Sequence, residues 1–169
     1  LHGSSAASDV YKRQLNKLSK STALQNTLSI EDYSSCDFIK SSNNFLLQKD
    51  LKIENKNIVF EKNYWKISAS HNGYFKKFKL DHHREIEFYP EQFKFIGHDK
   101  IIRKDPDKQI KFDIRFHLHP DSKVMKTQNN KFILIQLEDE GWQFSCDNYD
   151  INIDNGLYFG NKNSYKENQ

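Results

Sequence analysis

Apolar and polar residues alternate along most of the chain, and this alternation is the main structural signal in the sequence. It is clearest over residues 110–119, where every even-numbered residue is apolar and every odd-numbered residue is polar. A period of two sends successive side chains to opposite faces, so this segment is predicted to be a strand with one buried face. The same pattern predicts strands at 64–71 and 83–89, and the second of these ends at Pro90.

Further strands are predicted from shorter runs. In residues 131–137 apolar side chains fall on both faces of the predicted strand, which predicts a strand covered on both sides. Seven other segments have strand-like composition: 51–54, 57–60, 93–96, 99–103, 142–145, 149–153 and 156–159. Turn residues such as Asn72-Gly73 recur about every 8–12 residues, and only residues 15–24 have the composition of a short helix. The pattern therefore predicts an all-β fold, an antiparallel β-sandwich.

The first residues differ in character from the rest of the chain. Residues 4–14 read as the translation of a transposase-based sequencing adapter, and the only methionine is Met125. We therefore expect residues 1–14 to be a non-native segment and exclude them from fold reasoning, with a natural flexible arm as the alternative. Residues 15–169 are then expected to form one β-rich domain that is incomplete on its N-terminal side, that is, a fragment.

Composition narrows the classes of function. The chain has 169 residues, and its 26 Lys and Arg residues exceed its 23 Asp and Glu residues, giving a net charge of +3. The basic residues form no block, so a nucleic-acid surface is not indicated. Apolar runs fall well short of the roughly 18 residues that a membrane-spanning helix needs. Cys36 and Cys146 lack metal-ligand spacing and leave the redox compartment open.

The polar face of segment 110–119 carries the clearest candidate chemistry. Side chains two apart on a strand lie about 6.6–7 Å apart on one face, so the five polar residues are predicted to form a row. These residues are Lys111, Asp113, Arg115, His117 and His119. The two histidines have the spacing to share a metal, and Arg115 beside them suits an anionic ligand. A solvated sheet face without a ligand is the plainer alternative.

Three histidines and one arginine elsewhere also stand out. His71 ends segment 64–71 beside a tight turn, where it either faces a cleft or is a hydrogen-bonded structural residue. Arg84 begins the apolar face of its strand, which favours a buried carboxylate as its partner. The adjacent His82 and His83 must point to opposite faces, so they cannot chelate one metal from a single strand.

Three motifs resemble those of the heparinase II/III-like family. K-S-T-A-L-Q-N-T at 20–27 is similar to the family's R-S-T-A-x-H-N-T. S-H-N-G-Y at 70–74, followed by H-R-E at 83–85, is similar to S-H-D-G-Y and H-R-R, and R-F-H-L-H-P at 115–120 matches the third motif. Order and spacing agree from about Leu18 to Gln169. The resemblance implies a supersandwich-like C-terminal β domain that follows an α/α toroid in a larger protein.

The resemblance also implies a function, that of a bacterial polysaccharide lyase. Characterised members offset the charge of a uronate carboxylate, remove the C5 proton and eliminate the 4-linked oxygen of an acidic polysaccharide. The catalytic residues are then expected upstream, in the N-terminal α/α-toroid domain, and the present chain alone is not expected to be active. His71, Arg115, His117 and His119 become candidates for lining the substrate cleft.

One residue departs from the family pattern. Gln25 stands where the family has a metal-ligand histidine, and a neutral amide is a poor ligand for zinc. We therefore expect no metal in this chain, although the parent family uses a divalent metal such as zinc. The departure keeps a second function open, a non-catalytic carbohydrate-binding or assembly module. A metal-dependent enzyme using His117 and His119 ranks third. The sequence leaves the compartment open, and a periplasmic or cell-envelope location would fit the parent.

Overall fold

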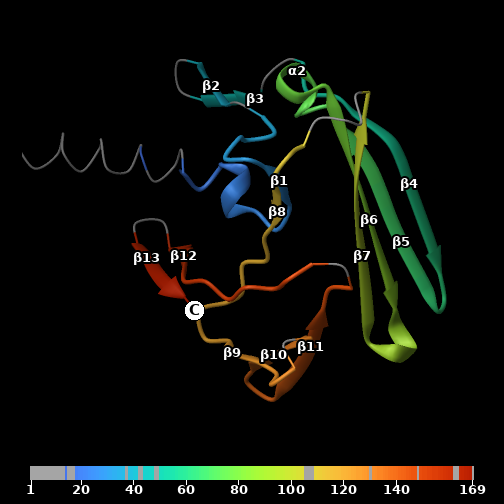
Figure 1. Cartoon of the computed structure of the whole chain (residues 1–169), viewed down its shortest axis with the longest axis vertical. Helices are drawn as coiled ribbons and strands as arrows, with labels where there is room; N and C mark the ends of the chain where they lie inside the picture. Colours follow the sequence, from blue (N-terminus) through green and yellow to red (C-terminus); the bar gives the residue numbers. More distant parts are fainter. Residues whose placement is uncertain are drawn as a thin grey trace, which may run out of the picture. The chain divides into compact units, whose positions relative to one another are not determined.

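The structure is a computed structural model of the chain (Figure 1). It describes residues 14, 18–36, 38–41, 44–47, 50–104, 109–129, 131–147, 149–161 and 164–168. Residues 38–41, 44–47, 157–161 and 164–168 are described by their backbone alone. Apart from Gln14, the predicted adapter-derived segment lies outside the described residues, so its non-native origin stays a prediction.

Strands make up most of the described chain, and every pairing between them is antiparallel. The strands are β1 (Leu28–Ile30), β2 (Phe38–Ser41), β3 (Asn44–Leu47), β4 (Ile53–Glu61), β5 (Tyr64–His71), β6 (Leu80–Tyr89), β7 (Lys94–Arg103), β8 (Phe112–Ile114), β9 (Lys123–Lys126), β10 (Phe132–Leu137), β11 (Glu140–Ser145), β12 (Gly156–Asn161) and β13 (Ser164–Asn168). The short helical turns are η1 (Thr22–Leu24), α2 (Phe75–Phe78) and η2 (Pro90–Gln92). The predicted all-β, antiparallel fold class is therefore confirmed.

The largest sheet is four-stranded, in the order β4-β5-β6-β7. Strand β5 coincides with the predicted segment 64–71, whereas β4 and β7 each join two segments that the sequence pattern separates. In β4 the interruption is a bulge between Glu54 and Asn57, where Asn55 has the left-handed backbone angle φ 52°. An extra residue at a bulge shifts the alternation of side chains by one, which is why the pattern resembles two strands.

The chain divides into two compact units, and the core cluster lies in the unit formed by residues 20–23 and 27–115. Five side chains form the buried cluster: Leu28, Ile30, Tyr74, Phe78 and Leu80. Half-buried residues of β7 and β8 pack against it, so the two-stranded sheet β1-β8 and the four-stranded sheet share this core. Both layers therefore contribute apolar side chains to one interior, as in a sandwich.

The predicted strand at 110–119 is wrong in its extent, because β8 covers only Phe112–Ile114. Its partner β1 is also three residues long. Two further backbone hydrogen bonds extend the ladder, one at each end: from Arg115 N–H to the Thr27 carbonyl (3.2 Å) and from Glu31 N–H to the Lys111 carbonyl (3.0 Å). Beyond it the chain turns, with Ser122 N–H donating to the His119 carbonyl at 2.9 Å. The alternation of apolar and polar residues in the sequence thus continues beyond the residues that have a partner strand.

The other unit comprises residues 1–19, 24–26 and 116–169. Its described strands form the three-stranded sheet β11-β10-β9 and the hairpin β12-β13. In β10 Ile133 is buried while the adjacent Leu134 is exposed, so the prediction of a strand covered on both faces is wrong. Residues 149–153 form no strand. Among all described residues, no helix has the length and apolar character needed to cross a membrane.

Candidate functional site

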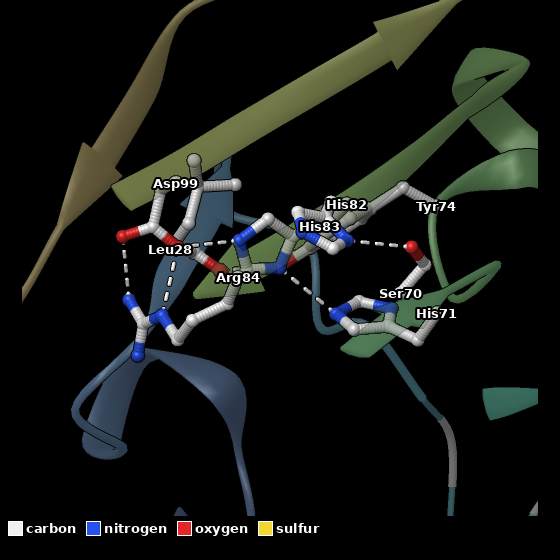
Figure 2. Close-up of polar contacts among 8 residues, drawn as sticks. All are labelled: Leu28, Ser70, His71, Tyr74, His82, His83, Arg84 and Asp99. Atoms are coloured by element: carbon white, nitrogen blue, oxygen red, sulfur yellow. Dashed lines mark hydrogen bonds and ion pairs between the residues drawn. The ribbon is translucent and has the colours of Figure 1, made fainter. Parts of the chain in front are cut away.

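Two histidines from neighbouring strands form the centre of a buried polar network (Figure 2). His71 at the end of β5 lies directly opposite His82 on β6 in the sheet register. The His71 Nε2 atom is 3.0 Å from His82 Nδ1, and the two rings are nearly perpendicular at 85°. His82 is 2% exposed, so this contact is shielded from solvent. We call the connected set Arg84, Asp99, His82 and His71 the histidine relay.

Asp99 on β7 anchors the relay at its other end. His82 Nε2 lies 2.6 Å from Asp99 Oδ1. Arg84 donates to the same carboxylate through Nε, at 2.7 Å, and through Nη2, at 2.8 Å (Figure 2). Burial alone would raise the pKa of Asp99, but the hydrogen bonds from His82 and Arg84 outweigh it and lower that pKa. Asp99 is therefore an ionised carboxylate that Arg84 binds in a bidentate manner.

The hydrogen bonds fix the protonation of both rings. Gly73 N–H donates to His71 Nδ1 at 3.1 Å, so this nitrogen is an acceptor and the proton of neutral His71 sits on Nε2. His71 Nε2–H then donates to His82 Nδ1, which leaves the His82 proton on Nε2, facing Asp99. Burial, together with His82 and Arg84, lowers the pKa of His71 from 6.5 to about 4. The relay is therefore directional, and His71 stays neutral near pH 7.

The relay supports the turn formed by Asn72, Gly73 and Tyr74. The Asn72 side chain accepts from Lys52 N–H at 2.8 Å and donates to the Asp50 carbonyl at 3.0 Å, so the turn is tied to the segment before β4. A Cβ atom on Gly73 would lie 2.1 Å from the Ser35 carbonyl oxygen. Only glycine fits at this point without displacing backbone.

Tyr74 connects the same turn to β1. Its side chain is fully buried, its hydroxyl donates to the Leu28 carbonyl at 2.8 Å, and its ring lies 5.7 Å from that of His71 (Figure 2). Burial raises the pKa of Tyr74 to about 12. A buried phenol that keeps its proton serves as a hydrogen-bond donor here, and it is poorly suited to act as a base.

Thr22 joins the first sequence motif to this region. Ser35 N–H donates to Thr22 Oγ1 at 2.8 Å, and Thr22 N–H donates to Ser34 Oγ at 3.2 Å. Ser35 is also the residue against which Gly73 packs. The S-T-A segment and the H-N-G-Y segment, about 50 residues apart in sequence, therefore meet at the backbone of one residue.

On the opposite face of the sheet, a second polar contact links β4, β5 and β6. Ser70 Oγ lies 2.9 Å from His83 Nδ1 and accepts from Asn55 Nδ2 at 3.3 Å. The prediction that His82 and His83 point to opposite faces is confirmed, because His82 contacts Asp99 and His83 contacts Ser70. The expected carboxylate partner of Arg84 is confirmed as well.

The four predicted cleft residues fall in different surroundings. His71 has both ring nitrogens engaged, Nε2 with His82 and Nδ1 with the Gly73 N–H. Arg115 donates to Ser29 Oγ and, through Nη2 at 2.9 Å, to Asp113 Oδ2, with 34% of its side chain exposed. His71 and Arg115 belong to the unit that holds the core.

His117 and His119 belong to the other unit. The His117 backbone N–H donates to Asn26 Oδ1 at 2.6 Å, and His119 Nδ1 lies 3.5 Å from Asp121 Oδ2 at an exposed turn. Because β8 ends at Ile114, the predicted row of five polar side chains along one strand is not formed. Lys111 precedes that strand, and Arg115 follows it.

The described residues do not supply a metal shell. Among them, no group of three or more His, Cys, Asp or Glu side chains gathers so that it could hold a metal ion. Gln25, which the sequence resemblance aligns with a metal-ligand histidine, donates from Nε2 to the Ser19 carbonyl at 2.9 Å.

Sequence reasoning missed His82 and Asp99 as members of one network. Alternation already places His82 on the same face of β6 as Arg84, so this part of the signal was present. The sequence pattern predicts two separate strands, 93–96 and 99–103, whereas Asp99 lies opposite Arg84 in the register of one continuous strand, β7. Tyr74 lies in a turn, where alternation carries no information about burial.

Comparison with known protein families gives a match. A family model described as Heparinase II/III-like, C-terminal, matches residues 3–169. No curated protein and no solved structure matched the chain.

Proposed function

The chain belongs to the heparinase II/III-like family, as a C-terminal domain, and we propose that it is the β-rich part of a lyase that cleaves uronate-containing acidic polysaccharide by β-elimination. The family match over residues 3–169 is the observation that carries this proposal, since it places the chain in a polysaccharide lyase context. The contact of two family motifs with Ser35 supports it, because Thr22 of one motif and Gly73 of the other both pack against this residue.

Arg115 is the residue of this chain best suited to a uronate. In β-elimination the C5 proton becomes acidic only when the charge of the adjacent carboxylate is offset by donors or a cation. Ser29 and Asp113 hold the guanidinium in place, while 34% of the Arg115 side chain remains exposed. An arginine held in this way offers its remaining N–H groups to a carboxylate. His117 and His119 are the other proposed contacts to the polymer.

His71 is proposed to act through the turn that follows it and not as a base. Its Nε2 is bonded to His82 and its Nδ1 accepts from Gly73 N–H, so its contribution is to hold Gly73 and Tyr74 in position. Tyr74 keeps its proton, because burial raises its pKa to about 12. The base that removes the C5 proton is therefore proposed to come from the N-terminal α/α-toroid domain that the family resemblance implies.

An elimination assay on the complete natural protein tests this proposal. We expect uronate polymers to give unsaturated products, followed by ultraviolet absorbance, and we expect the 169-residue chain alone to give none. Arg115→Lys should lower kcat/KM about tenfold to a hundredfold, because the charge stays but the planar fork is lost. Arg103→Lys on β7 is the matched control and should leave the rate unchanged. Absence of product from every uronate polymer would overturn the proposal.

Gln25 favours a second function, a non-catalytic carbohydrate-binding or assembly module. Its amide is committed to the Ser19 carbonyl, and it replaces the histidine that the family uses for metal. Under this alternative the complete protein binds an acidic polysaccharide but releases no unsaturated product, with or without added zinc. Measuring polymer binding and product in the same samples separates the two functions.

A further inference from the structure

The four-stranded sheet has one face whose apolar side chains continue beyond the part that the core covers. On this face, the row next to His71 and His82 contains Ala69, Arg84 and Asp99. The following two rows consist of apolar residues and one glycine, and we call them the apolar patch. Its members are Ile58, Ile67, Ile86 and Gly97 in one row, and Phe60, Trp65, Phe88 and Phe95 in the next.

The apolar patch is open to solvent. Ile58 is 74% exposed, Phe60 75% and Phe95 58%. The opposite face of the same strands carries polar side chains, including the ion pair between Lys66 and Glu85. A contiguous apolar surface of this kind marks an interaction site, because monomeric proteins seldom expose a large one.

The ring geometry indicates what kind of partner fits. Phe60 and Trp65 stack at 5.0 Å with an interplanar angle of 27°, and Phe88 and Phe95 stack at 4.3 Å and 20°. Rings that face one another present their edges outward, whereas a sugar needs an open ring face. The neighbouring isoleucine row would also leave sugar hydroxyls without hydrogen bonds. The patch therefore suits an apolar protein surface.

We propose that the apolar patch is a homodimer interface, in which two copies of the chain pack these sheets face to face. A two-fold interface brings each residue close to its own copy, so a charged patch would repel itself; this patch holds no charged residue. From the exposed fractions, its side chains offer on the order of 700 Å², taking about 150–250 Å² for each large side chain. Specific interfaces bury about 600–1,000 Å² per partner, so the area of the patch lies within this range.

Gly97 gives the interface a specific fit. A Cβ atom at Gly97 would meet nothing within 4 Å, so the isoleucine row ends in a hollow at β7. A two-fold axis along the strands places β4 of one copy over β7 of the other. The exposed Ile58 of each copy then enters the hollow at Gly97 of its partner, and Phe60 packs against the partner's Phe95, as knobs and holes do between packed sheets.

Sedimentation velocity of the full chain over a range of micromolar concentrations tests the proposal. We expect a monomer–dimer equilibrium in which Phe60→Lys weakens association at least about tenfold, as for a buried aromatic anchor. Gly97→Val should weaken it as well while leaving the monomer folded, because the added side chain meets no atom of its own chain. Ile102→Lys, at a 45% exposed position on the opposite face, is the control and should leave the dimer intact.

Two outcomes would overturn the homodimer. One is a chain that sediments as a monomer at every concentration. If a neutral or acidic glycan then alters Trp65 fluorescence in that monomer, the patch binds sugar instead of a second copy. The other is a dimer that responds to Ile102→Lys as strongly as to Phe60→Lys, or that ignores Gly97→Val. Because each variant is first checked for native circular dichroism, loss of folding cannot imitate loss of association.

Discussion

Asp99 is the residue on which the histidine relay depends, since it accepts hydrogen bonds from both His82 and Arg84. Asp99→Asn keeps the shape of the side chain but removes its negative charge, so the guanidinium of Arg84 loses its charged partner. We expect a loss of about 2–4 kcal/mol in the free energy of unfolding, as for removal of one member of a mostly buried pair. Urea denaturation followed by circular dichroism measures this loss.

Asp113→Asn provides the matched control. It also removes a carboxylate from an arginine, but Asp113 is 59% exposed and its partner Arg115 is solvated. Exposed pairs contribute about 0–1 kcal/mol, so this variant should unfold almost as the parent chain does. Equal losses for the two variants would mean that the relay carries no special stability.

His71 makes stability depend on pH in a defined window. Burial lowers the pKa of His71 from 6.5 to about 4, so the unfolded chain takes up this proton at higher pH than the folded chain does. The stabilisation is therefore complete above about pH 6.5 and is lost as the pH falls toward 4, by roughly 2 kcal/mol after allowance for partial exposure. Asp99 stays ionised in this window, because its pKa is lowered too.

Comparison with His71→Gln isolates this contribution from that of the other histidines. Urea midpoints measured between pH 7 and pH 4.5 should fall more steeply for the parent chain than for the variant. The glutamine amide retains a donor for His82 but does not titrate. Parallel pH profiles for the two proteins would contradict the lowered pKa of His71.

At the scale of elements, the turn between β5 and α2 is the least tolerant feature. Gly73→Ala would place a methyl carbon 2.1 Å from the Ser35 carbonyl oxygen, so backbone must move. We expect destabilisation of about 1–3 kcal/mol or more, as for overpacking in an interior. Gly141→Ala, where a Cβ meets nothing within 4 Å, should change thermal stability little. A Gly73→Ala variant as stable as Gly141→Ala would refute the close packing.

The strands themselves follow from the sequence to different degrees. Alternation located β5 at its observed bounds, because both of its edges are paired along their length. It overestimated β8, since a strand also needs a partner and β1 supplies only three residues. Bulges and pairing partners are long-range features, and a period of two along one segment contains no information about them.

The candidate site was predictable only in part for the same reason. Arg84 and the opposite orientations of His82 and His83 follow from local alternation. The bond between His71 and His82, and the position of Asp99, depend on the register across three strands. The family motifs at 70–74 and 83–85 pointed to the correct region, although not to the carboxylate that holds it together.

At the scale of the whole molecule, the two units differ in how many buried apolar side chains their described residues contain. The buried cluster, which includes Leu28, Ile30 and Leu80, lies in the unit formed by residues 20–23 and 27–115. In the other unit, Ile133 is the buried hydrophobic residue among those that the structure describes. Local stability follows buried apolar contact, so the units should open at different free energies.

Hydrogen exchange followed by mass spectrometry can read these units separately. We expect peptides from β6 and β1 to exchange slowly, at the free energy of global unfolding, and peptides from β9 to β11 to exchange much faster. Leu80→Ala should cost about 2–5 kcal/mol and accelerate exchange throughout the first unit, because its side chain is fully buried. Ile133→Val should accelerate exchange in β9 to β11 alone. Equal protection of β6 and β10 in the parent chain would show instead that a single cooperative interior spans the molecule.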